Sequence, residues 1–168
     1  MILEAGSPRR YPRWCATGFE VDLREVAPKL FVGGQQAILL RSPMKWAAAI
    51  DLFGSPNGSE RTRLDVRRDA AFGGVPVTLR WPFLDGQVIP PGCLEASYVV
   101  FRMAERHGSV LVSCQAGLSR SASVAYGLLR RGFGLDHAEA LRRVSVTTEP
   151  GFPREETLAS ARAWARKR

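Results

Sequence analysis

The sequence predicts an α/β fold with a central, mainly parallel sheet flanked by helices. Short apolar runs that suit buried strands alternate along the chain with longer segments that suit helices. Segments containing glycine and proline separate these elements. The length of 168 residues suits one domain with a sizeable core. We therefore expect a single domain over residues 21–168, preceded by an irregular N-terminal arm over residues 1–20 that carries prolines, glycines and arginines.

The first half of the chain is predicted to contribute strands. Residues 29–33 form a short strand that ends at glycines, and residues 47–53 form a buried one. The second run would also suit the end of a helix, but its length favours a strand. Residues 54–74 are polar and read as a surface connection. Residues 75–80 form another strand, where Pro76 suits an edge or a strand start.

The second half is predicted to alternate between helices and one central strand. After a proline-rich loop over residues 82–92, residues 94–107 read as a helix that Gly108 ends. Residues 109–113 form a compact strand, and residues 121–131 form a helix. Asp136 and Glu139 have the spacing of a capping box, which predicts a helix over residues 136–146. A last helix is expected over residues 153–167.

Composition excludes several classes of protein. Apolar residues make up 45% of the chain, as in ordinary globular proteins. The net charge of +8 comes mainly from arginine and would attract anions. No stretch is a dense basic block, so a solvated arginine-rich surface is favoured over nucleic-acid binding. No apolar run approaches the roughly 20 residues that span a bilayer, and no signal-peptide pattern is seen. We expect a monomeric cytoplasmic protein that binds neither nucleic acid nor membrane.

The cysteines favour reduced thiols over a disulfide framework. There are three, Cys15, Cys93 and Cys114, and none forms a CxxC pair. With two histidines in the whole chain, a structural zinc site is disfavoured. We predict no metal and no other cofactor.

The segment VLVSCQAGLSRS, residues 110–121, carries the strongest functional signal. A buried strand leads into Cys114, a short loop follows that contains Gly117, and a helix begins at once. This geometry turns successive backbone N–H groups inward and points the positive end of the helix dipole at the loop. Such a loop binds a tetrahedral oxyanion, and Arg120 could hold two of its oxygens with its planar guanidinium.

The same electrostatic field favours the thiolate form of Cys114. A thiolate at this position could attack phosphorus in line and form a phosphocysteine, which water would then hydrolyse. The spacing of Cys, five residues and Arg therefore predicts a phosphatase. The alternative is a buried structural cysteine at the end of a strand.

A proton donor for the leaving oxygen is also needed, and Asp85 is the best candidate. It lies in WPFLDG, residues 81–86, after a predicted strand and at the sheet edge where the Cys114 loop should emerge. The alternative is that Asp85 only makes a turn with Gly86. The competing candidates lie further upstream and are less well placed: Asp51, Asp65 and Asp69.

These residues resemble a known family. VLVSCQAGLSRSASVAYGLL resembles the signature of the dual-specificity subgroup of the cysteine-based protein tyrosine phosphatases. EVAPKLFVGG resembles the opening strand of that family, LRWPFLDG its general-acid loop, and HAEALRRVSVTTEPGFPREETL its C-terminal helices. The resemblance spans about residues 21–165.

The resemblance implies a cofactor-independent phosphatase with assigned residue roles. Cys114 is the nucleophile, Asp85 the general acid, and Ser121 assists departure of the thiolate. The backbone amides of the loop bind the phosphate oxygens, and the Arg120 side chain binds phosphate and the transition state. The loop residues are Gln115, Ala116, Gly117, Leu118, Ser119 and Arg120. The variable positions among them are uncharged, which favours a phosphoprotein substrate, such as phosphotyrosine with or without phosphoserine and phosphothreonine.

The chain departs from the family pattern at two places, and two alternatives stay open. Ser113 replaces the histidine that usually precedes the nucleophile, which implies reduced activity. Residues 147–149 replace an arginine common in the C-terminal part of the family. The first alternative is a catalytically weak, phosphate-binding pseudophosphatase. The second is a thiol-dependent redox or arsenate-reducing enzyme, in which Cys93 could pair with Cys114.

Overall fold

The computed structural model describes residues 9–10, 23–39, 46–54, 61–66, 76–145 and 152–166. Its strands are β1 (Arg9–Arg10), β2 (Leu23–Ala27), β3 (Leu30–Gly34), β4 (Trp46–Phe53), β5 (Arg63–Asp65), β6 (Val77–Phe83) and β7 (Ser109–Cys114). Its helices are α1 (Gln36–Leu39), α2 (Cys93–Ala104), α3 (Arg120–Gly132), α4 (His137–Val144) and α5 (Glu155–Arg166).

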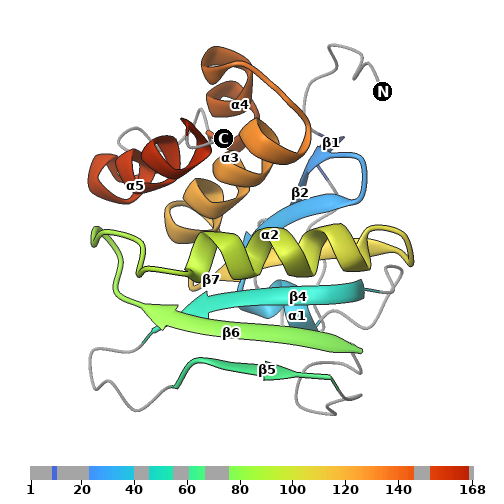
Figure 1. The fold of residues 1–168 in the computed structure, drawn as a ribbon. Coiled ribbons are helices and arrows are strands. Elements are labelled where there is room, and N and C mark those ends of the chain that lie inside the picture. The colour runs from blue at the N-terminus through green and yellow to red at the C-terminus, as the bar shows by residue number, and fades with distance from the viewer. Residues whose placement is uncertain are drawn as a thin grey trace.

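The strands of the described residues form one sheet in the order β1-β2-β3-β7-β4-β6-β5. The four central strands, β3, β7, β4 and β6, are parallel to their neighbours in this block, while β1, β2 and β5 pair antiparallel at the two sides. The expected α/β fold with a mainly parallel central sheet is confirmed. Because the central strands are parallel, their carboxyl ends lie at the same edge, where α3 begins (Figure 1).

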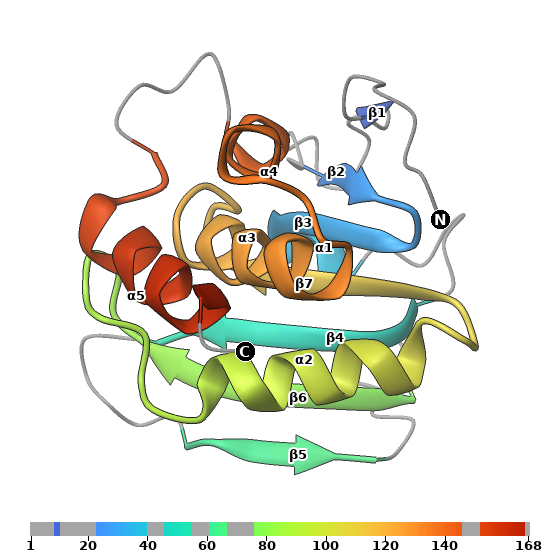
Figure 2. The same cartoon turned by 45° about the horizontal axis from the view of Figure 1, so that its top comes forward.

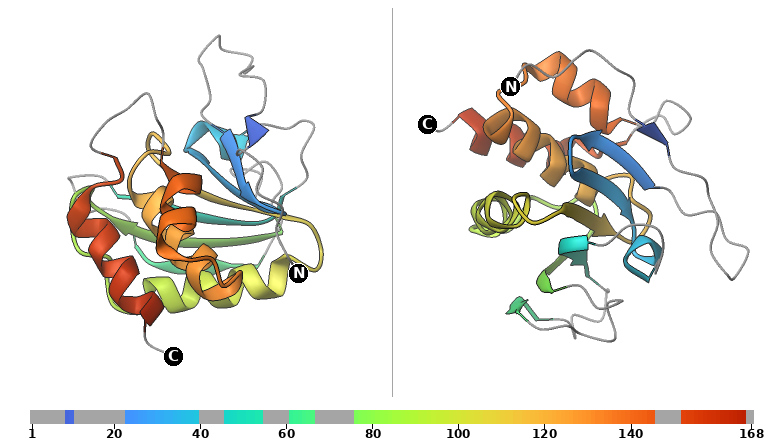
Figure 3. Two further views of the ribbon diagram at one scale, coloured as in Figure 1. Left: turned by 90° about the horizontal axis from the view of Figure 1, so that it is seen from above. Right: turned by 90° about the vertical axis from the view of Figure 1, so that its right-hand side faces the viewer.

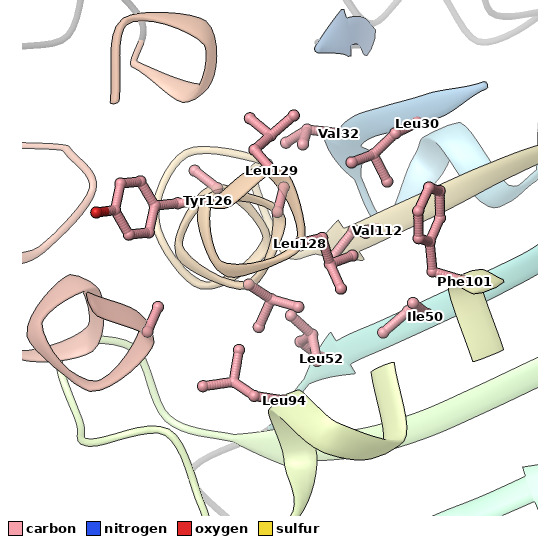
Figure 4. Close-up of a cluster of buried hydrophobic side chains, with 14 of the residues drawn as sticks. Leu30, Val32, Ile50, Leu52, Leu94, Phe101, Val112, Tyr126, Leu128 and Leu129 are labelled. Carbon is pink, nitrogen blue, oxygen red and sulfur yellow. The ribbon is translucent and has the colours of Figure 1, made fainter. Parts of the chain in front are cut away.

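Helices α2 to α5 cover one face of the sheet, and α1 covers the other (Figure 3). Two clusters of buried apolar side chains cover the two faces of the sheet. Successive side chains of β7 point to opposite faces, so Val110 and Val112 belong to the larger cluster and Leu111 to the smaller one. Figure 4 shows the larger cluster, where side chains of β3, β4 and β7 meet those of α2 and α3. The smaller cluster is Leu23, Phe31, Ala37, Ile38, Trp46, Ala49 and Leu111.

Helix α3 is the central helix, and it contacts α2, α4, α5 and β7 (Figure 2). Small residues permit this close packing. A Cβ atom on Gly127 would lie 3.2 Å from the Leu94 side chain and 3.4 Å from the Trp164 ring. In the described part of the chain, no helix is long and apolar enough to cross a membrane.

Most predicted elements are confirmed with small shifts at their ends. The strands expected at 29–33, 47–53 and 109–113 are β3, β4 and β7, and the four helices expected after residue 93 are α2 to α5. The capping interaction at the start of α4 is also present, because the Asp136 carboxylate accepts a hydrogen bond from the Glu139 N–H at 2.8 Å.

Several elements differ from the expectation. Strand β6 continues through Pro82 to Phe83, where the sequence predicted a loop, and it is not an edge strand because β5 pairs with it. The pairing of β4 with β6 shifts between Asp51 and Phe53, and this irregularity accommodates a proline inside the strand. Strand β5 lies within the expected surface connection, and β1 lies within the expected irregular arm. Residues 1–8, 11–20, 55–60 and 67–74 of these segments lie outside the described residues, as does residue 75 of the strand expected at 75–80.

Candidate active site

The predicted loop joins the central strand to the central helix. Cys114 is the last residue of β7, Arg120 is the first of α3, and Gly34 of β3 pairs with Cys114. Gly117 has a φ of 79°, and a Cβ atom there would lie 2.7 Å from the carbonyl carbon of Gly33. The loop therefore lies directly on the end of β3, and this approach requires glycine at position 117.

Two hydrogen-bonding groups converge on the Cys114 sulfur. The Gly117 N–H donates to Sγ at 3.3 Å, and the Ser121 hydroxyl lies 3.2 Å from it. Cys114 as a residue is 2% exposed, and its sulfur lies at the N-terminal end of α3. Inward N–H groups and the positive end of a helix dipole both favour negative charge at this point.

The loop carbonyls are bound from outside the loop. The Gln35 N–H donates to the Gln115 carbonyl at 3.2 Å, and the Arg24 guanidinium donates to the Gly117 carbonyl at 2.8 Å. In a trans peptide the C=O and the following N–H point in opposite directions. The N–H groups of Ala116 and Leu118 are therefore directed away from these outer partners.

Arg120 is buried, with 4% of the residue exposed, and is anchored by one nitrogen. Its Nη1 atom donates to the Phe83 carbonyl at 2.9 Å and lies within 3.5 Å of the Leu52 and Gly54 carbonyls. Its Nε atom is buried and has no hydrogen-bond partner among the described residues. An unpartnered buried N–H costs about 1–3 kcal/mol, and an oxyanion is a partner that would remove this cost.

Asp85 follows the carboxyl end of β6, at the same edge of the sheet as the loop. It follows Phe83 by two residues, so the strand end that Arg120 binds leads directly into it, and its side chain is exposed. The other candidates are engaged elsewhere or lie outside the described residues. Asp65 pairs with Arg63 at 2.8 Å on the edge strand β5, and Asp69 is not among the described residues.

Asp51 lies inside the sheet, in register with Ser113 on one neighbouring strand and Arg80 on the other. Its Oδ1 accepts a hydrogen bond from the Phe53 N–H at 3.1 Å, and its Oδ2 lies 3.2 Å from the Arg80 Nε. Burial raises the pKa of this carboxyl above its ordinary value, although the Phe53 amide and Arg80 oppose the change. Both carboxylate oxygens of Asp51 therefore contact groups within the sheet.

Ser113, which occupies the position of the usual histidine, is fully buried between strands. Its hydroxyl donates to the Ile50 carbonyl of β4 at 3.5 Å. The side chain thus contacts the neighbouring strand through one long hydrogen bond. The region that replaces the C-terminal arginine, residues 147–149, lies outside the described residues.

Sequence reasoning missed several residues that shape the loop. Gly34 lets the loop approach β3, since a Cβ atom there would lie 3.1 Å from the Gln115 carbonyl oxygen. The signal in the sequence is the glycine pair at the end of the predicted strand. The Ser119 hydroxyl accepts a hydrogen bond from the Arg154 N–H at 3.2 Å, which ties the segment before α5 to the loop. The contact of Arg24 with Gly117 joins residues 93 positions apart and left no local signal.

Solved structures with a similar fold include several phosphatases. Human DUSP28 matches with a TM-score of 0.62 at 22% identity, over 95% of this chain and 97% of that one. A cysteine-to-serine variant of P. aeruginosa TpbA in complex with pTyr matches with a TM-score of 0.54 at 22% identity, over 86% and 83% of the two chains. PTPMT1 in complex with PI(5)P matches with a TM-score of 0.60 at 14% identity, over 85% and 94%.

Neither the protein-family models nor the curated proteins compared with the chain give a match. The structural matches define the class of fold: it is that of the protein tyrosine and dual-specificity phosphatases. The fold expected from the sequence resemblance is therefore confirmed.

Proposed function

We propose that this protein is a cysteine-dependent phosphatase that hydrolyses phosphate monoesters through a phosphocysteine intermediate. The observation that carries the proposal is the hydrogen bond from the Gly117 N–H to the Cys114 sulfur at 3.3 Å, inside a loop that ends at a helix N-terminus. A donor N–H and the positive end of a helix dipole thus meet at the position where an oxyanion would bind. The unpartnered Nε of Arg120 supports the same conclusion.

In the first step, the Cys114 thiolate attacks phosphorus while the loop amides and Arg120 hold the equatorial oxygens. The bond between phosphorus and the ester oxygen breaks, and the Asp85 carboxylic acid gives its proton to that oxygen. An alcohol or phenol leaves, and the phosphoryl group remains on sulfur.

In the second step, water attacks the phosphocysteine and the sulfur–phosphorus bond breaks. The Asp85 carboxylate takes the proton of the attacking water, and inorganic phosphate is released. The Ser121 hydroxyl, 3.2 Å from the sulfur, donates a hydrogen bond to the thiolate as it leaves. The reaction needs no metal and no other cofactor.

We assign the substrate class to phosphoproteins, with phosphotyrosine as the preferred residue. The exposed loop positions Gln115 and Ala116 carry no charge, so they offer no additional binding groups to a highly phosphorylated lipid. Structures of this fold hold pTyr in one case and PI(5)P in another, so the fold itself is compatible with either class.

A phosphate-binding module with very slow turnover is the second candidate, and Ser113 favours it. A serine that donates to Ile50 cannot supply the ring nitrogens with which a histidine would orient the loop. The backbone amides and Arg120 would still bind phosphate.

The decisive experiment measures phosphate release from a phosphotyrosine peptide and searches for the covalent intermediate. We expect Cys114→Ser to abolish turnover while retaining phosphate binding, and Arg120→Lys to lower kcat/KM by at least about 100-fold. Ser121→Ala should accumulate phosphocysteine after acid quenching. Ser123→Ala, which removes a buried hydroxyl without a hydrogen-bond partner among the described residues of the chain, should not.

The result that would overturn the enzyme assignment is the absence of Cys114-dependent turnover at every pH from acid to neutral. If phosphate still bound to such a protein, the second candidate would be correct.

A further inference from the structure

Arg24 is a buried arginine that connects the loop to two other elements. It lies on β2 and is 3% exposed. Its Nη2 donates to the Gly117 carbonyl at 2.8 Å, and its Nη1 donates to the carbonyl of Val144, at the end of α4, at 3.1 Å. Charge-assisted hydrogen bonds of this length hold a backbone carbonyl more strongly than neutral ones.

The orientation of the Gly117–Leu118 peptide follows from this contact. The Gly117 carbonyl points toward Arg24, so the Leu118 N–H points away from it, because the peptide is planar and trans. On the other side of the same glycine, the Gly117 N–H points at the Cys114 sulfur. Glycine rotates freely about φ and ψ, so this peptide could turn over unless an outer group held its carbonyl.

We propose that Arg24 is a positioning residue that fixes the Gly117–Leu118 peptide with its N–H directed into the loop, where it donates to a bound phosphate oxygen. Arg24 itself does not touch the substrate. This inference deepens the proposed function, because it adds a distant residue to the anion site, but it concerns phosphate binding and does not depend on turnover.

Arg143 offers a matched control. It is also a buried arginine between α4 and β2, with 7% of the residue exposed. Its Nη1 donates to the Val26 carbonyl at 3.2 Å, and its Nε donates to Glu139 at 2.6 Å. Replacing either arginine by methionine removes a buried guanidinium from the same interface. Arg24 donates to the loop carbonyl of Gly117, whereas these two hydrogen bonds of Arg143 lie on β2 and within α4.

The test measures the dissociation constant of inorganic phosphate by calorimetry and follows the Leu118 amide by NMR. For Arg24→Met we expect phosphate to bind at least about tenfold more weakly, since a hydrogen bond to a charged group is worth roughly 10- to 100-fold in affinity. The phosphate-induced shift of the Leu118 amide should be lost. Arg143→Met should keep both within about twofold of the wild type, even if it unfolds at lower denaturant concentration.

Unchanged phosphate affinity in Arg24→Met, or an equal loss in Arg143→Met, would overturn the proposal. If Arg24→Met does not fold, Arg24→Lys and Arg143→Lys replace the pair. Lysine cannot hold two carbonyls with a planar fork, so Arg24→Lys should weaken phosphate binding and Arg143→Lys should not. If phosphate affinity depends on Arg24 but the protein never turns over substrate, the enzyme proposal is refuted and this inference stays intact.

Discussion

Gly117 is the residue at which the loop and strand β3 come closest. Its φ of 79° lies in the left-handed region, and an added Cβ would lie 2.7 Å from Gly33 and 2.8 Å from Gly34, both backbone contacts. Backbone atoms cannot move aside as the end of a flexible side chain can. An alanine here would displace the loop away from β3 and carry the Gly117 amide away from the sulfur.

We therefore expect Gly117→Ala to lower phosphate affinity by at least about 100-fold, since several loop amides lose their positions together. Gly134→Ala is the control, because Gly134 has a φ of 68° but an added Cβ meets no atom within 4 Å. It should cost about 1–2 kcal/mol in unfolding free energy and leave phosphate binding intact. Equal phosphate affinities in the two variants would contradict this account of the loop.

The two described cysteines differ in their surroundings. Both are free cysteines. Cys93 begins α2 and is fully buried, and burial raises its pKa to about 12, although a hydrogen bond with Ser97 opposes this. At neutral pH it is a thiol and not a thiolate, which does not suit a redox partner.

We expect iodoacetamide to modify Cys114 in the native protein and to leave Cys93 unmodified, as read by peptide mass mapping. Bound phosphate should protect Cys114, since the anion covers the sulfur. In denaturant both should react. Detection of a Cys93–Cys114 disulfide after mild oxidation would restore the redox alternative.

At the scale of elements, Glu139 of α4 forms ion pairs with two arginines of the same helix. Glu139 accepts hydrogen bonds from Arg142 at 2.7 and 2.8 Å and from Arg143 at 2.6 Å. The hydrogen bonds from Arg142 and then Arg143 lower the pKa of Glu139 from 4.5 to about 2. The folded state therefore binds fewer protons at this carboxylate than the unfolded state does across that range.

It follows that this carboxylate stabilises the fold fully above about pH 4.5 and loses that effect as the pH falls toward 2. We expect Glu139→Gln to lower the unfolding free energy by about 1 kcal/mol at pH 7 and by much less at pH 2.5, measured by urea unfolding. Glu156→Gln, at an exposed carboxylate of α5, should stay within about 0.5 kcal/mol at both pH values. A deficit for Glu139→Gln that did not shrink in acid would refute this explanation.

At the scale of the whole molecule, the parallel sheet brings distant segments to one edge. Cys114 ends β7, while Asp85 follows β6, and β4 lies between these strands. Arg120 connects the loop to β6, because it is the last residue of the loop and its side chain donates to the Phe83 carbonyl at 2.9 Å. The order of strands in the sheet therefore places the proposed acid at the same edge as the loop, although the two segments are distant in the sequence.

We expect Asp85→Asn to lower kcat/KM for a phosphotyrosine peptide by about 100- to 10,000-fold, the usual range for loss of a general acid. The loss should be much smaller for an aryl phosphate whose phenol is strongly acidic, because that oxygen leaves without a proton. Asp65→Asn, on the far edge strand, should behave as wild type toward both substrates. Equal losses for the two substrates in Asp85→Asn would disqualify Asp85 as the acid.

Local patterns in the sequence were sufficient for the central elements. Apolar runs predicted β4 and β7, the spacing of Asp136 and Glu139 predicted the start of α4, and Cys114, Gly117 and Arg120 predicted the loop. Each of these signals depends on neighbours within a few residues, and such interactions are the same in most tertiary contexts. Pro82 was misleading because its place in β6 depends on a shift in the pairing of β6 with β4, which the local sequence does not show.

By itself, the sequence determined the fold class, the loop with its thiol and the candidate acid. Only the tertiary structure decided what surrounds the loop: Gly33 against Gly117, Arg24 on the Gly117 carbonyl, and Arg120 on the end of β6. The physical reason is separation along the chain. A backbone carbonyl looks the same at every position of a sequence, so the arginine that binds it can be identified only once the sheet has brought the two together.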